Sequence, residues 1–242
     1  MGSETSKVAI VTGGSRGIGR ACVEALLIEG YGVWFCSRNP NGVREAERRW
    51  RERWDGRVHG RAVDVGDQGE VDAFVEEVHG AEGRIDCLVN NAGLGFFAPV
   101  DEITGDDWRR VRAANLDGPF YFTRAVAPIM RRQGEGFIVN VASLAGRNAF
   151  AGGSVYNATK FGLLGFSEAA MLDLRQDGVR VAAVLPGSVA TDFHADGAGI
   201  GSTPPANMLR AEDVARSILD LLSYPGHALP SHVELRPARP KS

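Results

Sequence analysis

The fold of this chain is decided by one stretch near its N-terminus, Val8-Ala9-Ile10-Val11-Thr12-Gly13-Gly14-Ser15-Arg16-Gly17-Ile18-Gly19. Its first four residues are an apolar run typical of a buried strand, and a helical pattern begins soon afterwards at Gly17. The glycines permit a tight turn, and they let the backbone approach a phosphate group at the positive N-terminus of the helix. A glycine cluster alone could be an ordinary loop, but its place between a strand and a helix favours a nucleotide site.

Outward from this stretch, apolar strand-like runs alternate with helical patterns along the whole chain. Further strands are expected at 33–36, 57–63, 87–89, 137–141, 179–185 and 233–235, and helices at 17–30, 43–54, 70–78, 106–115, 118–132, 155–176 and 212–222. Strands that are continuously apolar belong in a parallel sheet covered on both faces. We therefore expect an α/β fold, a Rossmann-like doubly wound sheet in a single domain over 1–242, with a polar leader at 1–6.

Composition excludes several classes of protein. The 242 residues are 44% hydrophobic and carry a formal net charge of −3, so no global positive field attracts nucleic acid or anionic lipid. The longest charge-free stretch, 87–100, is too short and too polar to span a membrane. The histidines form no metal-spaced pair. Cys22, Cys36 and Cys87 are widely spaced in apolar segments, which is typical of reduced thiols and predicts a cytoplasmic protein.

Further motifs follow the later strands and helices: Asn90-Asn91-Ala92-Gly93, Asn115, Ser143, Tyr156-Asn157-Ala158-Thr159-Lys160 and Pro186-Gly187. Together with the Gly-x-x-x-Gly-x-Gly spacing after Thr12, their order and spacing resemble the short-chain dehydrogenase/reductase family, in its compact single-domain branch. The resemblance covers nearly the whole chain. It implies an oxidoreductase that uses a nicotinamide cofactor and acts on a small carbonyl or alcohol substrate.

The end of the second expected strand indicates which nicotinamide cofactor is used. An acidic residue about 20 positions after the glycines would bind the ribose 2′-hydroxyl of NAD, whereas arginine accommodates the 2′-phosphate of NADP. No Asp or Glu occurs from Gly30 to Arg44. We therefore expect NADP(H), with Arg16, Arg38 and the Ser37 hydroxyl around the phosphate; the alternative is that both arginines are ordinary surface residues.

The resemblance also implies where the rest of the cofactor lies. Asp64 and Val65 would contact the adenine, and Val189 and Thr191 would hold the carboxamide. The full set of expected cofactor contacts is Gly13, Ser15, Arg16, Gly17, Ile18, Gly19, Ser37, Arg38, Asp64, Val65, Asn91, Ala92, Gly93, Tyr156, Lys160, Pro186, Gly187, Val189 and Thr191.

Four residues are the candidate catalytic group: Asn115, Ser143, Tyr156 and Lys160. Tyr156 and Lys160 are four apart on an expected helix and share one face. A nearby cation lowers the pKa of a phenol from its ordinary value of about 10, so we expect Tyr156 to act as a general acid or base. The resemblance implies that Ser143 binds the carbonyl oxygen, that Lys160 holds the nicotinamide ribose and that Asn115 keeps a water in a proton path. Read singly, each could be an ordinary turn, surface or helix-end residue.

The substrate pocket is expected beyond the carboxyl ends of the strands. Its main candidates are Leu94, Phe96, Arg147, Phe150, Phe193 and Met208, with Phe97, Asn148, His194 and Leu209 beside them. The glycine- and proline-rich segment at 192–210 resembles a substrate lid. These mostly apolar residues favour an apolar carbonyl compound, while Arg147 could either bind an acid group or face solvent.

Several functions remain open at this point. NADPH-dependent reduction of a ketone or aldehyde is the first; a 3-oxoacyl-carrier-protein reductase is the second, although the chain lacks the glycine-rich tail usual in those relatives. An NAD-linked alcohol or hydroxy-acid dehydrogenase and a non-catalytic NADP-binding redox sensor are further alternatives. The family resemblance implies a homotetramer or homodimer, built on the long helices at 118–132 and 155–176.

Overall fold

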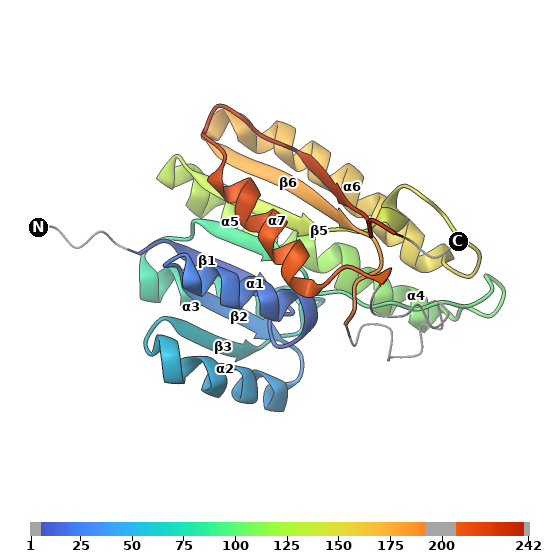
Figure 1. Cartoon of the computed structure of the whole chain (residues 1–242), viewed down its shortest axis with the longest axis horizontal. Coiled ribbons are helices and arrows are strands. Elements are labelled where there is room, and N and C mark those ends of the chain that lie inside the picture. The colour runs from blue at the N-terminus through green and yellow to red at the C-terminus, as the bar shows by residue number, and fades with distance from the viewer. Residues whose placement is uncertain (1–5, 192–206, 240–242) are drawn as a thin grey trace, which may run out of the picture.

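A parallel sheet forms the centre of the molecule (Figure 1), a computed structural model that describes residues 6–191 and 207–239. Its strands within these ranges are β1 Val8–Thr12, β2 Gly32–Ser37, β3 Val58–Ala62, β4 Cys87–Asn90, β5 Gly136–Val141, β6 Val179–Pro186 and β7 His232–Leu235. The order is β3-β2-β1-β4-β5-β6-β7, and every neighbouring pair is parallel. The direction of winding reverses between β1 and β4, and ligands of doubly wound sheets bind in the crevice at that point.

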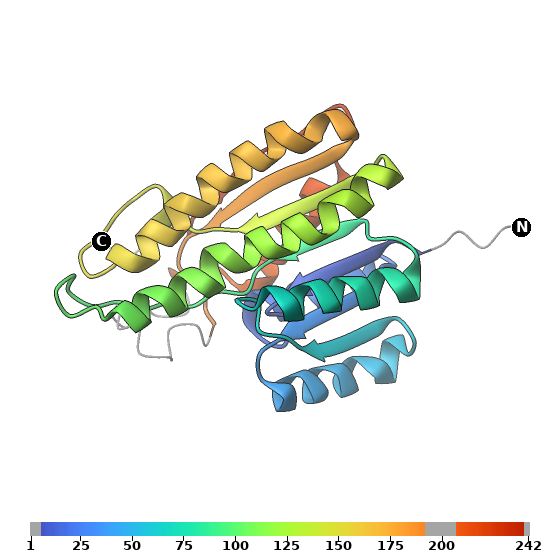
Figure 2. The ribbon, with the colours of Figure 1, turned by 180° about the vertical axis from the view of Figure 1, so that it is seen from behind.

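Helices cover both faces of this sheet (Figures 1 and 2). On one face lie α1 Gly17–Ile28, α2 Pro40–Trp54 and α7 Ala211–Ser223, and on the other lie α3 Gln68–Glu82, α5 Gly118–Gln133 and α6 Ser154–Leu174. The short helix α4, Gly105–Arg112, precedes α5. The expected Rossmann-like α/β fold in a single domain is therefore confirmed. No helix among the described residues is both long and apolar enough to cross a membrane.

The alternation of side chains along β1 shows why the strands read as continuous apolar runs. All five residues of β1 are buried, but Ala9 and Val11 belong to the core on the α1 side of the sheet, whereas Val8 and Ile10 belong to the core on the α3 side. Because successive side chains of a strand point to opposite faces, a strand with a helix layer on each side turns every side chain into a core, and apolar residues fill most of its positions.

Capping residues explain why α2 and α3 begin a few residues earlier than the hydrophobic periodicity predicts. Helix α2 begins at Pro40 because the Asn39 side chain accepts hydrogen bonds from the amides of Asn41 and Gly42. Helix α3 begins at Gln68 because Asp67 accepts one from the amide of Glu70. The expected helix 106–115 ends earlier, since α4 stops at Arg112 and a π-helical turn, Ala113–Asp117, joins it to α5.

Candidate active site

The glycine turn between β1 and α1 is the part of the site whose backbone is most constrained. Gly13 and Gly17 have φ values of 66° and 56°, which L side chains rarely adopt. A Cβ on Gly19 would lie 2.2 Å from the carbonyl oxygen of Gly13. These three positions therefore require glycine, and the amides at the start of α1 are left open to a ligand.

Hydrogen bonds attach this turn to the end of β4. The Thr12 hydroxyl accepts hydrogen bonds of 2.9 Å from the backbone amides of both Asn91 and Ala92. The Asn91 side-chain amide donates to the carbonyl oxygen of Thr12, also at 2.9 Å. The two strands on either side of the winding reversal are thus joined at their carboxyl ends, which fixes the floor of the crevice.

A cavity of about 1770 Å³ occupies this crevice and extends along the carboxyl edge of the sheet. The expected cofactor contacts line it, with the exception of Gly19, which lies beneath the turn. Ser143, Tyr156 and Lys160 also line it, as do Leu94, Phe96, Phe97, Asn148 and Phe150. The structure therefore brings the nucleotide half and the catalytic half of the sequence motifs into one continuous space.

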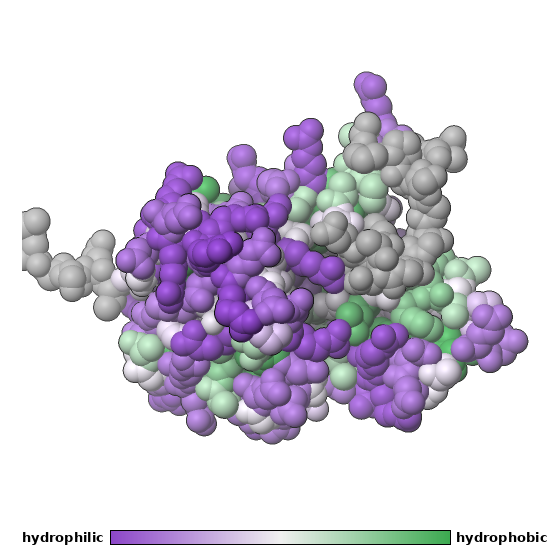
Figure 3. All heavy atoms as spheres, turned by 90° about the horizontal axis from the view of Figure 1, so that it is seen from below, coloured by the Kyte–Doolittle hydropathy of each residue, from purple (hydrophilic) through white to green (hydrophobic). Residues whose placement is uncertain are grey.

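Arginines gather at the end of the cavity near α2. Arg16 and Arg38 line it together with Arg20 and Arg49, and the hydroxyls of Ser15 and Ser37 are 3.0 Å apart between them. Seen from below, the surface over α2 is strongly hydrophilic, while hydrophobic residues gather toward the opposite end of the same face (Figure 3). Glu45 lines this end as well, on the first half of α2. Cationic and hydroxyl donors at this place fit a phosphate group.

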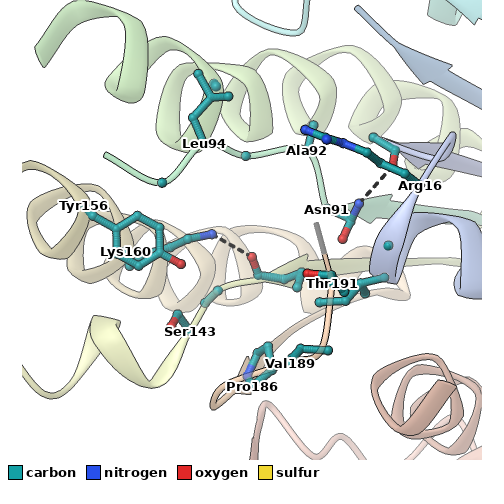
Figure 4. Close-up of a pocket in the computed structure, with 18 of the residues that line it drawn as sticks. Arg16, Asn91, Ala92, Leu94, Ser143, Tyr156, Lys160, Pro186, Val189 and Thr191 are labelled. Atoms are coloured by element: carbon teal, nitrogen blue, oxygen red, sulfur yellow. Dashed lines mark hydrogen bonds between the residues drawn. The ribbon is translucent and has the colours of Figure 1, made fainter. Parts of the chain in front are cut away.

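Three of the four catalytic candidates, Ser143, Tyr156 and Lys160, meet in the other half of the cavity (Figure 4). Tyr156 and Lys160 come from the first turns of α6, and Ser143 lies two residues after the end of β5. Lys160 is 5% exposed, and its Nζ donates a 3.0 Å hydrogen bond to the carbonyl oxygen of Val141. The last residue of β5 thus holds the lysine between the sheet and the tyrosine ring, whose centre is 5.7 Å from Nζ.

Burial sets the pKa values of this pair. It raises the pKa of Tyr156 to about 12, although a hydrogen bond with Ser143 acts in the opposite direction, and it lowers the pKa of Lys160 to about 8. Loss of solvation is thus the larger of the two effects on the pKa of Tyr156, and the expected lowering of this pKa by Lys160 stays a prediction. At neutral pH the phenol is protonated, which is the state of a general acid.

Asn115 is buried and does not line the cavity. Its side chain accepts a 2.7 Å hydrogen bond from the amide of Leu94 and donates to the carbonyl oxygen of the same residue at 2.9 Å. It also donates to the Thr159 hydroxyl, which in turn donates to the carbonyl oxygen of Tyr156. Asn115 therefore connects the loop after β4 to the first turns of α6; the expected water-holding role stays a prediction.

Two aromatic rings, those of Phe97 and Phe150, form an aromatic wall beside the tyrosine. Phe97 meets Tyr156 edge to face, with ring centres 5.3 Å apart, and Phe150 lies 5.6 Å from Phe97. Phe96 lies under the guanidinium of Arg110, which is 5.7 Å from its ring centre. An apolar wall next to the catalytic hydroxyl fits the expected apolar part of the substrate.

Some of the expected substrate residues lie elsewhere. Arg147 is outside the cavity lining and forms a 2.7 Å ion pair with Glu234, so the expectation that it lines the pocket is wrong. Met208 and Leu209 are described but do not line the cavity. Phe193, His194 and most of the expected lid at 192–210 lie outside the described residues, as does the leader at 1–6 apart from Ser6.

Other lining residues were missed from the sequence, notably Arg110 on α4 and Arg236 and Pro237 after β7. Arg236 and Pro237 could have been predicted from the sequence, because they directly follow an expected strand and the residues after parallel strands face the ligand crevice.

Comparison with known proteins matches residues 7–200 of this chain to the family model described as short chain dehydrogenase. The chain belongs to the short-chain dehydrogenase family. An uncharacterized oxidoreductase of Staphylococcus saprophyticus is 32% identical over 96% of this chain and 97% of its own length. A monensin polyketide synthase putative ketoacyl reductase of Streptomyces virginiae is 39% identical over 79% of this chain and 74% of its own length.

A solved structure agrees with this assignment. A metagenomic short-chain oxidoreductase in complex with NADP is 34% identical and superposes with a TM-score of 0.84, covering 98% of this chain and 100% of its own. As a short-chain dehydrogenase, the protein is an NAD(P)-dependent oxidoreductase that acts on CH–OH groups. Such a reaction requires an acid–base group beside the substrate, and Ser143, Tyr156 and Lys160 line the cavity.

Proposed function

We propose that this protein reduces a ketone or aldehyde to the alcohol with NADPH as the hydride donor. The observation that carries the proposal is a single cavity with arginines and hydroxyls at one end and a protonated, buried Tyr156 beside Ser143 and Lys160 at the other. The residues present fit the dinucleotide, because Gly13 and Gly17 line the cavity without a side chain and so let a pyrophosphate approach the backbone at the start of α1. Gly13 to Gly17 would hold the pyrophosphate, and Lys160 the nicotinamide ribose.

The mechanism follows from the protonation states of the site. When bound, the cofactor supplies the hydride. The Ser143 hydroxyl donates a hydrogen bond to the substrate's carbonyl oxygen and positions it. Tyr156 donates its proton to the same oxygen, a contribution of about 10²–10⁴ in rate for general acids of this kind. Lys160, held on Val141, lies behind the ring and places positive charge next to the phenolate that remains.

The preference for NADPH rests on the chemistry at the end of β2. Arg38 and Arg16 line the cavity there, and the Ser37 hydroxyl lies beside that of Ser15. A 2′-phosphate would accept charge-assisted hydrogen bonds from these groups. No Asp or Glu stands from Gly30 to Arg44, where one would bind the 2′-hydroxyl of NAD and repel a phosphate.

Steady-state assays with both cofactors test the proposal. NADPH oxidation with a panel of ketones is expected to be at least ten times more efficient than NADH oxidation, and Arg38→Asp should reverse the order. Equal use of NADH by the wild-type protein would refute the cofactor assignment and leave an NAD-linked dehydrogenase. Tyr156→Phe should bind NADPH as tightly as the wild type does and lose turnover, and full activity in that variant would refute the mechanism.

A ketoacyl thioester is a second candidate substrate. The observation that favours it is the 39% identical relative named a putative ketoacyl reductase. The same assay discriminates the two readings, because an acyl thioester in the panel would be reduced with a KM well below those of simple ketones. Tight NADPH binding with no oxidation by any member of the panel would instead indicate a redox sensor.

We further propose that the protein forms a homodimer or homotetramer through α5 and α6. These two long helices lie next to each other on the α3 side of the sheet (Figure 2). Their outer surface exposes Phe120, Phe161 and Leu172 by 45%, 46% and 50%, respectively. Gly165 lies one turn after Phe161, and a Cβ there would meet no atom within 4 Å. An apolar, flat helix pair of this kind suits the self-complementary contact of a two-fold axis.

A further inference from the structure

A charged cluster outside the catalytic group links the end of β7 to the turn after β5. The carboxylate of Glu234 accepts a 2.7 Å hydrogen bond from Arg147 and, through its other oxygen, one of 3.0 Å from Arg236. Two guanidiniums thus share one carboxylate. Among the described residues, no other acidic side chain forms an ion pair with either arginine. The cluster therefore keeps a net charge of +1.

The two arginines differ in what they face. Arg236 and Pro237 line the cavity, whereas Arg147 and Glu234 do not. The Gly187 amide donates a 2.8 Å hydrogen bond to the carbonyl oxygen of Leu235. A Cβ on Gly187 would be 3.2 Å from both Pro237 and Leu144. These contacts place Arg236 at the rim of the catalytic half, next to the turn that begins with Ser143.

No carboxylate among the described lining residues opposes this charge in the catalytic half. The acidic residues among the described lining residues are Glu45 on α2 and Asp64 after β3, and both lie at the nucleotide end. Arg110, the other arginine on the substrate side, is matched one to one by Asp107 at 3.1 Å and covers the Phe96 ring. Lys160 also lines this half, but its Nζ is held on the carbonyl oxygen of Val141 beside Tyr156. Arg236, which shares its carboxylate with Arg147, is thus a cation at the rim whose charge is available to a molecule in this half of the cavity.

From this arrangement we propose that Arg236 binds an anionic group of the substrate, so that the natural substrate is a carbonyl compound that also carries a carboxylate, sulfonate or phosphate. The inference rests on the proposed carbonyl reduction. Glu234 and Arg147 act as positioning residues. Arg147 holds the carboxylate of Glu234, which accepts one hydrogen bond from Arg236. The rest of the planar guanidinium of Arg236 is then free to bind an anion through paired N–H groups. The aromatic wall of Phe97 and Phe150 contacts the apolar part between the two polar ends.

The experiment compares keto acids with their methyl esters. Methyl ketones with a terminal carboxylate, separated from the carbonyl by one to four methylenes, are assayed with NADPH, each beside its methyl ester. We expect kcat/KM for the acid to exceed that for the ester by about tenfold at the best chain length, through KM. That tenfold is the low end for a hydrogen bond to a charged group, because the Arg236 side chain is 58% exposed. The preference should shrink as the salt concentration rises.

Variants of Arg236 distinguish anion binding at this residue from a general effect of positive charge on the same tail. Arg236→Gln should lower kcat/KM for the acid by about tenfold and so remove the acid preference, and Arg236→Lys should restore part of the preference. Arg239→Gln is the matched control, since Arg239 is exposed on the same tail and lies outside the cavity lining. Equal kcat/KM for acid and ester at every chain length, or an equal loss in the Arg239 variant, would overturn the proposal.

A binding measurement keeps this outcome distinct from failure of the proposed function. Calorimetric titration of the protein with NADP⁺ present compares hexanoate with hexanamide, neither of which can be reduced. Tighter binding of hexanoate by about tenfold, lost in Arg236→Gln, supports the anion site even if no ketone is turned over. Equal affinity for the two ligands overturns it even if ketone reduction is observed.

Discussion

Replacing Lys160 by methionine is expected to abolish turnover while making the free protein more stable at neutral pH. The lysine is 5% exposed and lies between α6 and the end of β5. Burial lowers its pKa from 10.5 to about 8, so the charged form is disfavoured in the folded state. Methionine fills a similar volume and carries no charge, so the variant avoids that cost.

The size of the effect follows from linkage between protonation and folding. Each pKa unit corresponds to about 1.4 kcal/mol, so the depressed pKa represents about 3 kcal/mol of destabilisation at pH 7. The unfolded chain binds this proton more tightly than the folded one, and stability therefore rises with pH between about 8 and 10.5. Loss of the hydrogen bond to Val141 costs the variant about 1–3 kcal/mol in return, leaving a small net gain at pH 7.

Urea unfolding of both proteins between pH 7 and 9.5 measures this directly. The advantage of Lys160→Met over the wild type should fall by about 2 kcal/mol across this range, because the wild type sheds its buried proton. Lys7→Met, at an exposed lysine, is the control for the removal of one positive charge at the surface. A constant difference between Lys160→Met and the wild type at all pH values would refute the reasoning that the buried ammonium carries the cost.

Two further substitutions test the turn and the helix pair. Gly19→Ala places a Cβ 2.2 Å from the carbonyl oxygen of Gly13. It should lower the free energy of urea unfolding by about 1–3 kcal/mol and weaken NADPH binding at least tenfold. Gly80→Ala on α3, whose Cβ would meet nothing within 4 Å, is the control and should be neutral or slightly stabilising. Phe161→Glu should dissociate the proposed oligomer, as measured by light scattering after size exclusion. Ile28→Glu, which also places a carboxylate at an exposed apolar residue but on α1, should leave the mass unchanged. An unchanged mass in Phe161→Glu would contradict the α5–α6 interface.

The sequence predicts the sheet and the nucleotide end of the site well, because both depend on local patterns. An apolar run, a glycine turn and a helix identify the β1–α1 unit without knowledge of anything distant. Tyr156 and Lys160 are found for the same reason, since helical spacing alone puts them on one face. The location of the cavity then follows from the rule that ligands bind where the winding reverses.

What spacing cannot supply is solvation and long-range pairing. The pKa of Tyr156 rises rather than falls because the phenol is buried, and burial depends on how α6 packs against β5. Arg147 lies outside the cavity because it pairs with Glu234, and local spacing cannot identify a partner 87 positions further along the chain. Arg236 is missed for a similar reason, since it reaches the site only because β7 adds to the sheet beside β6.

The π-helical turn between α4 and α5 makes this region sensitive to the number of residues it contains. The amide of Gly118 bonds to the carbonyl oxygen of Ala113, five positions back, where an α-helix would use four. Removing one residue from 113–117 would let α4 and α5 continue as one regular α-helix, with hydrogen bonds four positions apart throughout. The change would fall on the wide turn itself, which carries Asn115 and its two hydrogen bonds to Leu94. A single-codon deletion here therefore removes the turn that connects the loop after β4 to α6, whereas the same deletion in a surface loop would only shorten it.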